Sequence, residues 1–157
     1  GAIALAMATE VPNAKIFAVE KSEDAMPFTA ANFAKYQDSG ATLVQGDLAD
    51  VFTELNGSVA VVASNPPYIP AAAIPRDVEV HLFDPAMALY GGQDGLDVIR
   101  VVSKKAQELL VPGGALIIEH ADSQSDEVVQ LLLADGWRQV RAHKDLTGRD
   151  RAVTALR

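Results

Sequence analysis

The chain has 157 residues, of which 49% are hydrophobic, and its formal net charge is −8. This length and apolar content favour one folded domain with a core and argue against disorder, while the absence of cysteine excludes disulfides and thiolate metal sites. Residues 1–90 carry 4 Lys and Arg against 11 Asp and Glu, and such an acidic surface makes nucleic acid an unfavourable partner.

The chain has no stretch that reads as a membrane span, because Lys, Glu or Pro interrupts each apolar run. Its apolar start, residues 1–6, lacks the basic leader of a signal peptide. We therefore expect a cytoplasmic protein. The three histidines, His81, His120 and His143, have no mutual spacing that suggests a metal site.

The predicted elements alternate between helices and strands. Helices are expected at 2–10, 22–37, 96–110 and 123–134. Strands are expected at 15–20, 41–45, 58–64, 115–119, 137–143 and 152–156, with a long polar, proline-containing connection at 69–95. This order predicts a single α/β domain over 1–157, with a three-layer sheet that is parallel at first and closed by antiparallel strands.

Three predicted strands end in a polar residue, and ligands of such sheets bind at the strand C-termini. Glu20 lies where an acid binds a ribose diol, although it could instead begin the next helix. Asp47 follows Gly46 and could accept a hydrogen bond from an adenine amine. Taken alone, Asp47 fits better as the residue of an Asx-turn.

The third strand end is the most specific feature of the chain. Here Asn65-Pro66-Pro67-Tyr68, called the acceptor motif below, follows an apolar strand. Two prolines fix the backbone and remove two N–H donors, so the Asn65 side-chain oxygen and the neighbouring carbonyls remain as acceptors. Such a rigid cluster beside an aromatic ring can hold a planar NH2 group and orient its nitrogen.

The chain resembles the release factor glutamine methyltransferases, which are class I S-adenosylmethionine-dependent methyltransferases. The likeness extends over nearly the whole chain and is carried by residues 1–6, 18–20, 45–48, 65–70, 88–96 and 144–151. It implies a Rossmann-like fold, S-adenosylmethionine as cofactor with S-adenosylhomocysteine as product, and N5-methylation of a glutamine in a peptide chain release factor. No metal is implied.

The resemblance also implies roles for individual residues. The cofactor would be bound by Gly1, Glu20, Asp47, Leu48 and Asn65. The substrate amide would be bound by Asn65, Pro66, Pro67 and Tyr68, with Asn65, Pro66 and Tyr68 as the catalytic set. Two departures from the family pattern are Asp84-Pro85 in place of Glu-Pro, and His120-Ala121 after Glu119.

The largest departure lies at Gly1, which resembles the last glycine of the family's cofactor loop. The first, central strand and the helical N-terminal domain have no counterpart in the sequence. We expect the chain alone to bind cofactor poorly. Either a further segment fills the missing-strand position, or the chain self-associates, or the sheet is rearranged. Two alternatives are an adenine-N6 methyltransferase acting on DNA or RNA, with the same acceptors holding a flipped base, and an inactive truncated fragment.

Overall fold

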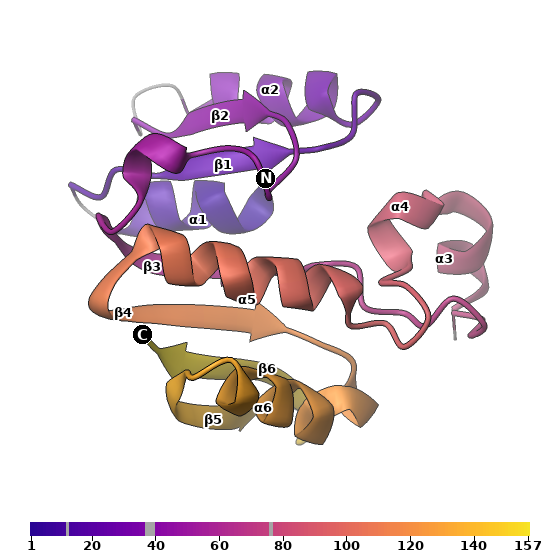
Figure 1. The fold of residues 1–157 in the computed structure, drawn as a ribbon. Helices are drawn as coiled ribbons and strands as arrows, with labels where there is room; N and C mark the ends of the chain where they lie inside the picture. Colours follow the sequence, from indigo (N-terminus) through magenta and orange to yellow (C-terminus); the bar gives the residue numbers. More distant parts are fainter. Residues whose placement is uncertain (12, 37–39, 76) are drawn as a thin grey trace. The chain divides into compact units, whose positions relative to one another are not determined.

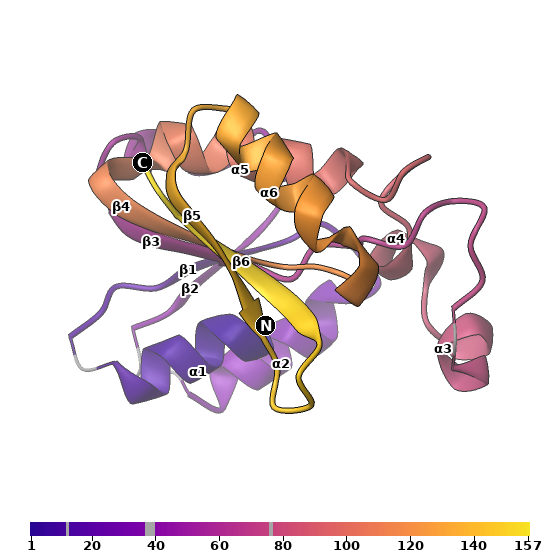
Figure 2. The same cartoon turned by 90° about the horizontal axis from the view of Figure 1, so that it is seen from below.

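A computed structural model describes residues 1–11, 13–36, 40–75 and 77–157 of the chain (Figures 1 and 2). The chain divides into two compact units, Gly1–Thr53 and Glu54–Arg157, and each is described by itself. The single domain expected over 1–157 stays a prediction.

The first unit pairs two helices with a two-stranded parallel sheet. Its elements are α1 (Ala2–Glu10), β1 (Phe17–Glu20), α2 (Met26–Ala34) and β2 (Thr42–Gln45). The register sets Phe17 opposite Thr42 and Glu20 opposite Gln45, so both strands end at the same edge. Figure 2 shows α1 and α2 on the same side of the two strands.

The second predicted helix is shorter than expected. We predicted residues 22–37, but the helix begins at Met26, with Pro27 in its first turn, where proline needs no N–H donor. Ser22 still caps this region, because its Oγ accepts the N–H of Ala25 at 3.1 Å. The predicted end at residue 37 lies outside the described residues.

The second unit is built on a four-stranded sheet in the order β3-β4-β6-β5. Its elements are η2 (Thr53–Leu55, at the unit boundary), β3 (Val59–Ser64), α3 (Val78–Phe83), α4 (Ala86–Leu89), α5 (Asp97–Leu109), β4 (Leu110–Glu119), η3 (Asp122–Gln124), α6 (Ser125–Ala134), β5 (Arg138–Lys144) and β6 (Asp150–Leu156). β3 and β4 are parallel, and β6 runs antiparallel to both of its neighbours.

The core of this unit lies between the sheet and the helices α5 and α6, which cover the same face (Figure 2). Ile99, Val102 and Ala106 recur at helical spacing along α5 and are fully or almost fully buried. They pack with side chains of β4 and α6, among which Leu116 and Leu132 are also fully buried. This packing fixes the sheet end from which the acceptor motif emerges.

Two predictions in this unit were wrong. Residues 69–95 contain the short helices α3 and α4, neither of which has a buried residue whose periodicity would reveal it. β4 begins at Leu110 and not at residue 115, because Leu110 pairs with Val59 of β3. Further along, Gly113 donates to the Arg157 carbonyl and Gly114 accepts from the Arg157 N–H. These two bonds keep a Pro-Gly-Gly sequence, expected to be a turn, inside the sheet.

The strands form two separate sheets. β1 pairs with β2 alone, and β3 pairs with β4 alone; no other strand within the described residues joins either of them. This is the pattern expected for a Rossmann-like sheet that lacks its central strand. Among the helices that the structure describes, none is both long and apolar enough to cross a membrane.

Candidate active site

The acceptor motif leaves the sheet where β3 ends, at Ser64, which is paired with Ile118 of β4. Pro66 is buried and anchors the motif, whereas Asn65 is exposed and Tyr68 is half-buried. Neither the Asn65 side chain nor the Pro66 carbonyl forms a hydrogen bond with any other described residue. Both acceptors are therefore without a partner in the described part of the chain, and their role as ligand-binding groups stays a prediction.

The residues after the motif are paired with the end of α4. The Ile69 N–H donates to the Leu89 carbonyl at 2.9 Å, and the Gly91 N–H donates to the Ile69 carbonyl at 2.9 Å. A third bond joins the Ala71 N–H to the Gly92 carbonyl at 2.8 Å. These bonds tie the motif to the glycine-containing segment 90–96, one of the segments that carried the family resemblance.

Two glycines of this segment are needed because the motif's backbone approaches them closely. A Cβ added to Gly91 would lie 2.5 Å from the carbonyl oxygens of Pro67 and Gly95. A Cβ on Gly95, whose φ is +81°, would lie 2.6 Å from Gln124 Nε2 and closer still to the Tyr68 carbonyl oxygen. Larger residues at either position would push the motif away from its support.

An ion pair fixes the end of this segment to α5. Arg100 Nη2 lies 2.5 Å from Asp94 Oδ2, and Asp94 Oδ1 accepts the N–H of Leu96 at 3.0 Å. The hydrogen bond from Arg100, supported by that from Leu96, lowers the pKa of Asp94 to about 2. The Asp94 carboxylate therefore stays ionised and holds the turn into α5 at any physiological pH.

Gln124 is a site residue that the sequence did not reveal. Its side chain is buried; Oε1 accepts the Ala121 N–H at 3.1 Å, and Nε2 donates to the carbonyls of Tyr68 at 2.9 Å and Asp94 at 3.4 Å. One amide thus joins the acceptor motif, the glycine segment and the end of β4. In the sequence, Gln124 stands in a polar run that is typical of a solvent-facing helix start, so no signal pointed to it.

The polar residues predicted in the first unit also come together. Lys21, next to Glu20, reaches across to the turn that follows β2, where its Nζ lies 2.7 Å from Asp47 Oδ2. Glu20 Oε1 accepts the Ser22 N–H at 2.9 Å. The hydrogen bond from Lys21 is the largest cause of a lowered pKa of Asp47. The ends of β1 and β2 therefore carry the ion pair between Lys21 and Asp47 and, beside it, the Glu20 carboxyl group.

Asp47 also forms the turn that the alternative interpretation predicted. Its Oδ1 accepts the Ala49 N–H at 3.0 Å, as in an Asx-turn, and Leu48 lies half-buried inside that turn. Gly1 lies against α2 instead, since a Cβ there would come within 2.7 Å of the Phe33 ring and 3.2 Å of Thr29. The structure thus gathers Glu20, Asp47 and Leu48 at one sheet end, with Gly1 at the start of α1.

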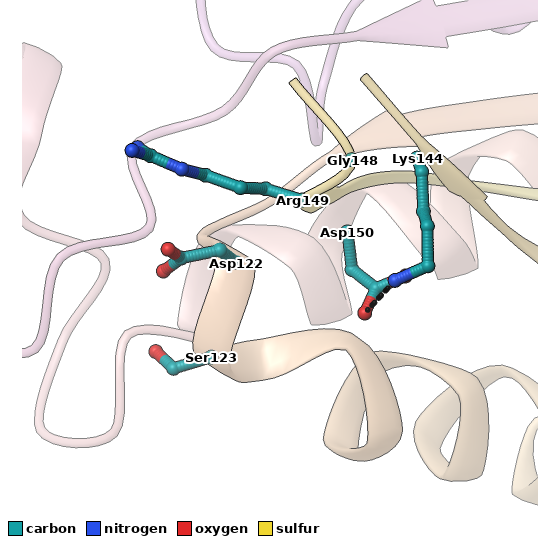
Figure 3. A pocket seen from close by; sticks show the side chains of 6 residues that line it. All are labelled: Asp122, Ser123, Lys144, Gly148, Arg149 and Asp150. Carbon is teal, nitrogen blue, oxygen red and sulfur yellow. Dashed lines mark hydrogen bonds and ion pairs between the residues drawn. The ribbon is translucent and has the colours of Figure 1, made fainter. Parts of the chain in front are cut away.

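A hollow of about 370 Å³ lies elsewhere in the second unit, between η3 and the turn that joins β5 to β6 (Figure 3). It is lined by Asp122, Ser123, Lys144, Gly148, Arg149 and Asp150. The Lys144 Nζ pairs with Asp150 at 3.1 Å, as Figure 3 shows. None of the site residues predicted from sequence lines this hollow.

His120, the residue that departs from the family pattern, is fully buried after β4. Its Nδ1 lies 2.7 Å from the Ala121 carbonyl, and its Nε2 has no hydrogen-bond partner within the described chain. No group of three potential metal ligands was found among the described residues. His120 is therefore part of the packing behind the site.

Comparison with known proteins shows which methyltransferases the chain is similar to. The chain is 43% identical over 159 residues to the release factor glutamine methyltransferase of Streptomyces coelicolor, covering 99% of this chain and 55% of that protein. It is 39% identical to a 4-amino-L-phenylalanine/4-methylamino-L-phenylalanine methyltransferase of Streptomyces pristinaespiralis, covering all of this chain and 52% of that protein. No family model matches the chain.

The chain is a homologue of the release factor glutamine methyltransferases. It spans about half the length of these curated relatives. The chain is also similar in structure to a methyltransferase from Pyrococcus furiosus, whose crystal structure superposes with a TM-score of 0.71 at 21% sequence identity. The match covers 99% of this chain and 68% of the Pyrococcus furiosus chain. The fold is accordingly the Rossmann-like methyltransferase fold, as predicted.

Proposed function

We propose that the protein methylates the side-chain amide nitrogen of a glutamine in a protein, and that this protein is a peptide chain release factor. The free acceptor pair at the end of β3, Asn65 Oδ1 and the Pro66 carbonyl, carries the proposal. A primary amide presents two N–H donors in one plane, and two fixed acceptors match them. The names of the relatives support glutamine as the bearer of that amide.

The acceptors would do more than bind. An amide nitrogen is a poor nucleophile because its lone pair is delocalised into the carbonyl group. Two acceptors held by Pro66 and Pro67 orient the nitrogen and stabilise the positive character that it gains as the new N–C bond forms. Tyr68 would pack on the amide plane, and the methyl replaces one hydrogen, which leaves as a proton.

S-adenosylmethionine is the methyl donor that we propose, and it would leave as S-adenosylhomocysteine. Glu20 fits the ribose diol, because it is half-buried at a strand end and its Oε2 forms no hydrogen bond within the described residues. Asp47 fits the adenine amine less directly, since Lys21 and Ala49 already bind its two oxygens. We assign Asp47 chiefly to shaping the turn that presents Leu48, and Gly1 to the cofactor side within the same unit.

Other acceptors of a methyl group compete with this proposal. The homologue that acts on 4-amino-L-phenylalanine makes an aromatic amine a second candidate. The exocyclic amine of adenine is a third, although the net charge of −8 disfavours DNA and RNA. A release factor substrate also implies that the protein acts in the cytoplasm, where bacterial translation takes place.

A methyl-transfer assay with the full-length protein decides among these substrates. We expect transfer to a release factor, on its glutamine, and none to DNA, RNA or 4-amino-L-phenylalanine. Asn65→Ala should lower kcat by about 10²–10³-fold, while the Kd for S-adenosylmethionine, measured by calorimetry, changes little. The matched control is Asn56→Ala, at an exposed position. Equal losses of turnover and cofactor affinity would contradict this role of Asn65.

A further inference from the structure

The surface of the α3–α4 segment, residues 77–88, has no role in the site described above. Every residue in it is exposed except Val80, which is half-buried. Four large apolar side chains are among the most exposed of the chain, with exposed fractions of 64% for Val78, 63% for Leu82, 79% for Phe83 and 56% for Met87. Figures 1 and 2 agree in showing α3 and α4 beyond the end of the β3–β4–β6–β5 sheet, away from α5 and α6.

Two physical arguments indicate that this segment binds something. α3 has six residues and α4 has four, well below the length at which an isolated helix is stable in water. Val78 and Leu82 are four residues apart and form one face of α3, and Phe83 lies beside them. A cluster of exposed apolar side chains on helices without a core is typical of an interaction surface.

The charge of the segment indicates the chemistry of its partner. Asp77, Glu79 and Asp84 are carboxylates, whereas residues 77–88 contain no Lys or Arg. A partner that covers the apolar side chains with least repulsion therefore carries Lys or Arg beside apolar residues. The same charge disfavours a second copy of this acidic segment.

The position of the segment indicates which protein this partner is. The C-terminal end of the segment lies beside the acceptor motif, where Ile69, next to Tyr68, bonds to the Leu89 carbonyl and to the Gly91 N–H at 2.9 Å each. A glutamine side chain is short, so a protein that presents one to Asn65 brings its neighbouring residues to the base of this segment. We propose that the α3–α4 segment is a docking surface for a basic, apolar stretch of the protein substrate that carries the methylated glutamine. This inference rests on the proposed function.

The test compares two substrates of the full-length protein, an intact release factor and a short peptide that holds only the accepting glutamine and its nearest neighbours. We expect Leu82→Ser/Phe83→Ser to raise the KM for the intact factor about tenfold or more, with kcat and the peptide's KM unchanged. The triple variant Asp77→Asn/Glu79→Gln/Asp84→Asn should raise the KM for the intact factor by a smaller amount. It should also make this KM less dependent on salt concentration. Leu133→Ser, at an exposed leucine of α6, is the matched control.

Each outcome decides the inference. An unchanged KM for the intact factor in both variants overturns it, and so does an equal loss with factor and peptide, which would indicate that the segment supports the site itself. A loss of DNA or RNA methylation in these variants would assign the surface to nucleic acid and overturn it too. If the wild-type protein methylates neither factor nor peptide, the proposed function has failed, and the inference fails with it.

Discussion

At the residue scale, the site depends on side chains that support the acceptors from behind. The acceptor motif itself was readable in the sequence, because its asparagine, two prolines and tyrosine are neighbours in the chain and directly follow an apolar strand. Its support was not readable. Gln124 is 56 residues from Tyr68 in the chain and contacts it only because β4 and η3 return to the end of β3.

Replacing Gln124 tests this support. Gln124→Leu keeps the volume but removes three hydrogen bonds, so we expect a loss of about 1–3 kcal/mol of stability and about 10- to 100-fold in kcat, because the motif is displaced. The loss of kcat should exceed the loss of affinity for S-adenosylmethionine. Gln130→Leu, an exposed position on α6, is the matched control. Wild-type kcat in Gln124→Leu would show that the motif holds its geometry alone.

Gly95 tests the same contact from the opposite side. A methyl group there meets both the Tyr68 carbonyl and Gln124, and its positive φ is strained for any other residue. We expect Gly95→Ala to lower stability by about 2–4 kcal/mol in urea unfolding and to reduce kcat. Gly113→Ala has nearly the same φ, +82°, with no atom within 4 Å, so it isolates the backbone strain. Equal effects of the two substitutions would mean that the close approach is unimportant.

At the element scale, the sequence predicted elements whose burial follows a regular period. α5 was predicted within one residue at each end, since its apolar residues recur at helical spacing. A turn between the last two strands was also predicted, but it spans residues 145–149, because Lys144 and Asp150 already pair in β5 and β6. Within this turn Asp145 Oδ1 accepts from Thr147 Oγ1 at 2.6 Å. α3 and α4 were not predicted because they bury nothing. The start of β4 was not predicted because its partners, Val59 and Arg157, are distant in the chain.

The turn into α5 gives a prediction about pH. The pKa of Asp94 is about 2 when folded, below the value of about 3.9 expected unfolded, so its contribution to stability is present above pH ~4 and is lost as pH falls toward 2. In Asp94→Asn, the free energy of unfolding should fall less steeply between pH 5 and pH 2 than in the wild type. Arg100→Gln should show the same weaker pH dependence of the free energy of unfolding. The double variant should lose little more stability than either single variant. Parallel curves for variant and wild type would contradict the coupling.

At the scale of the whole molecule, the strands form two sheets whose edges include β1 and β3. β3 is apolar and uncharged along Val59–Ser64, and its Val61 is 41% exposed. A strand of this kind offers unpaired N–H and C=O groups to any other chain. The position of β3 at the edge of its sheet therefore has a measurable consequence.

We expect the 157-residue chain to associate as its concentration rises, which sedimentation equilibrium can measure. Val61→Lys should weaken this association, because a charge on an edge strand opposes pairing with another strand. Leu133→Lys introduces the same charge on α6, away from any edge, and should leave association unchanged. A monomer at every concentration, or an equal effect of the two lysines, would exclude pairing through β3.

The sequence by itself determined the alternation of strands and helices, the polar ends of β1, β2 and β3, and the acceptor motif, because each is a local pattern written in neighbouring residues. The tertiary structure alone decided what stands behind that motif: the Gln124 amide, the two close glycines, and the exposed α3–α4 segment beside it. The reason is physical. Hydrogen bonds and close contacts between residues far apart in the chain depend on how the strands pair, and no local pattern records that pairing.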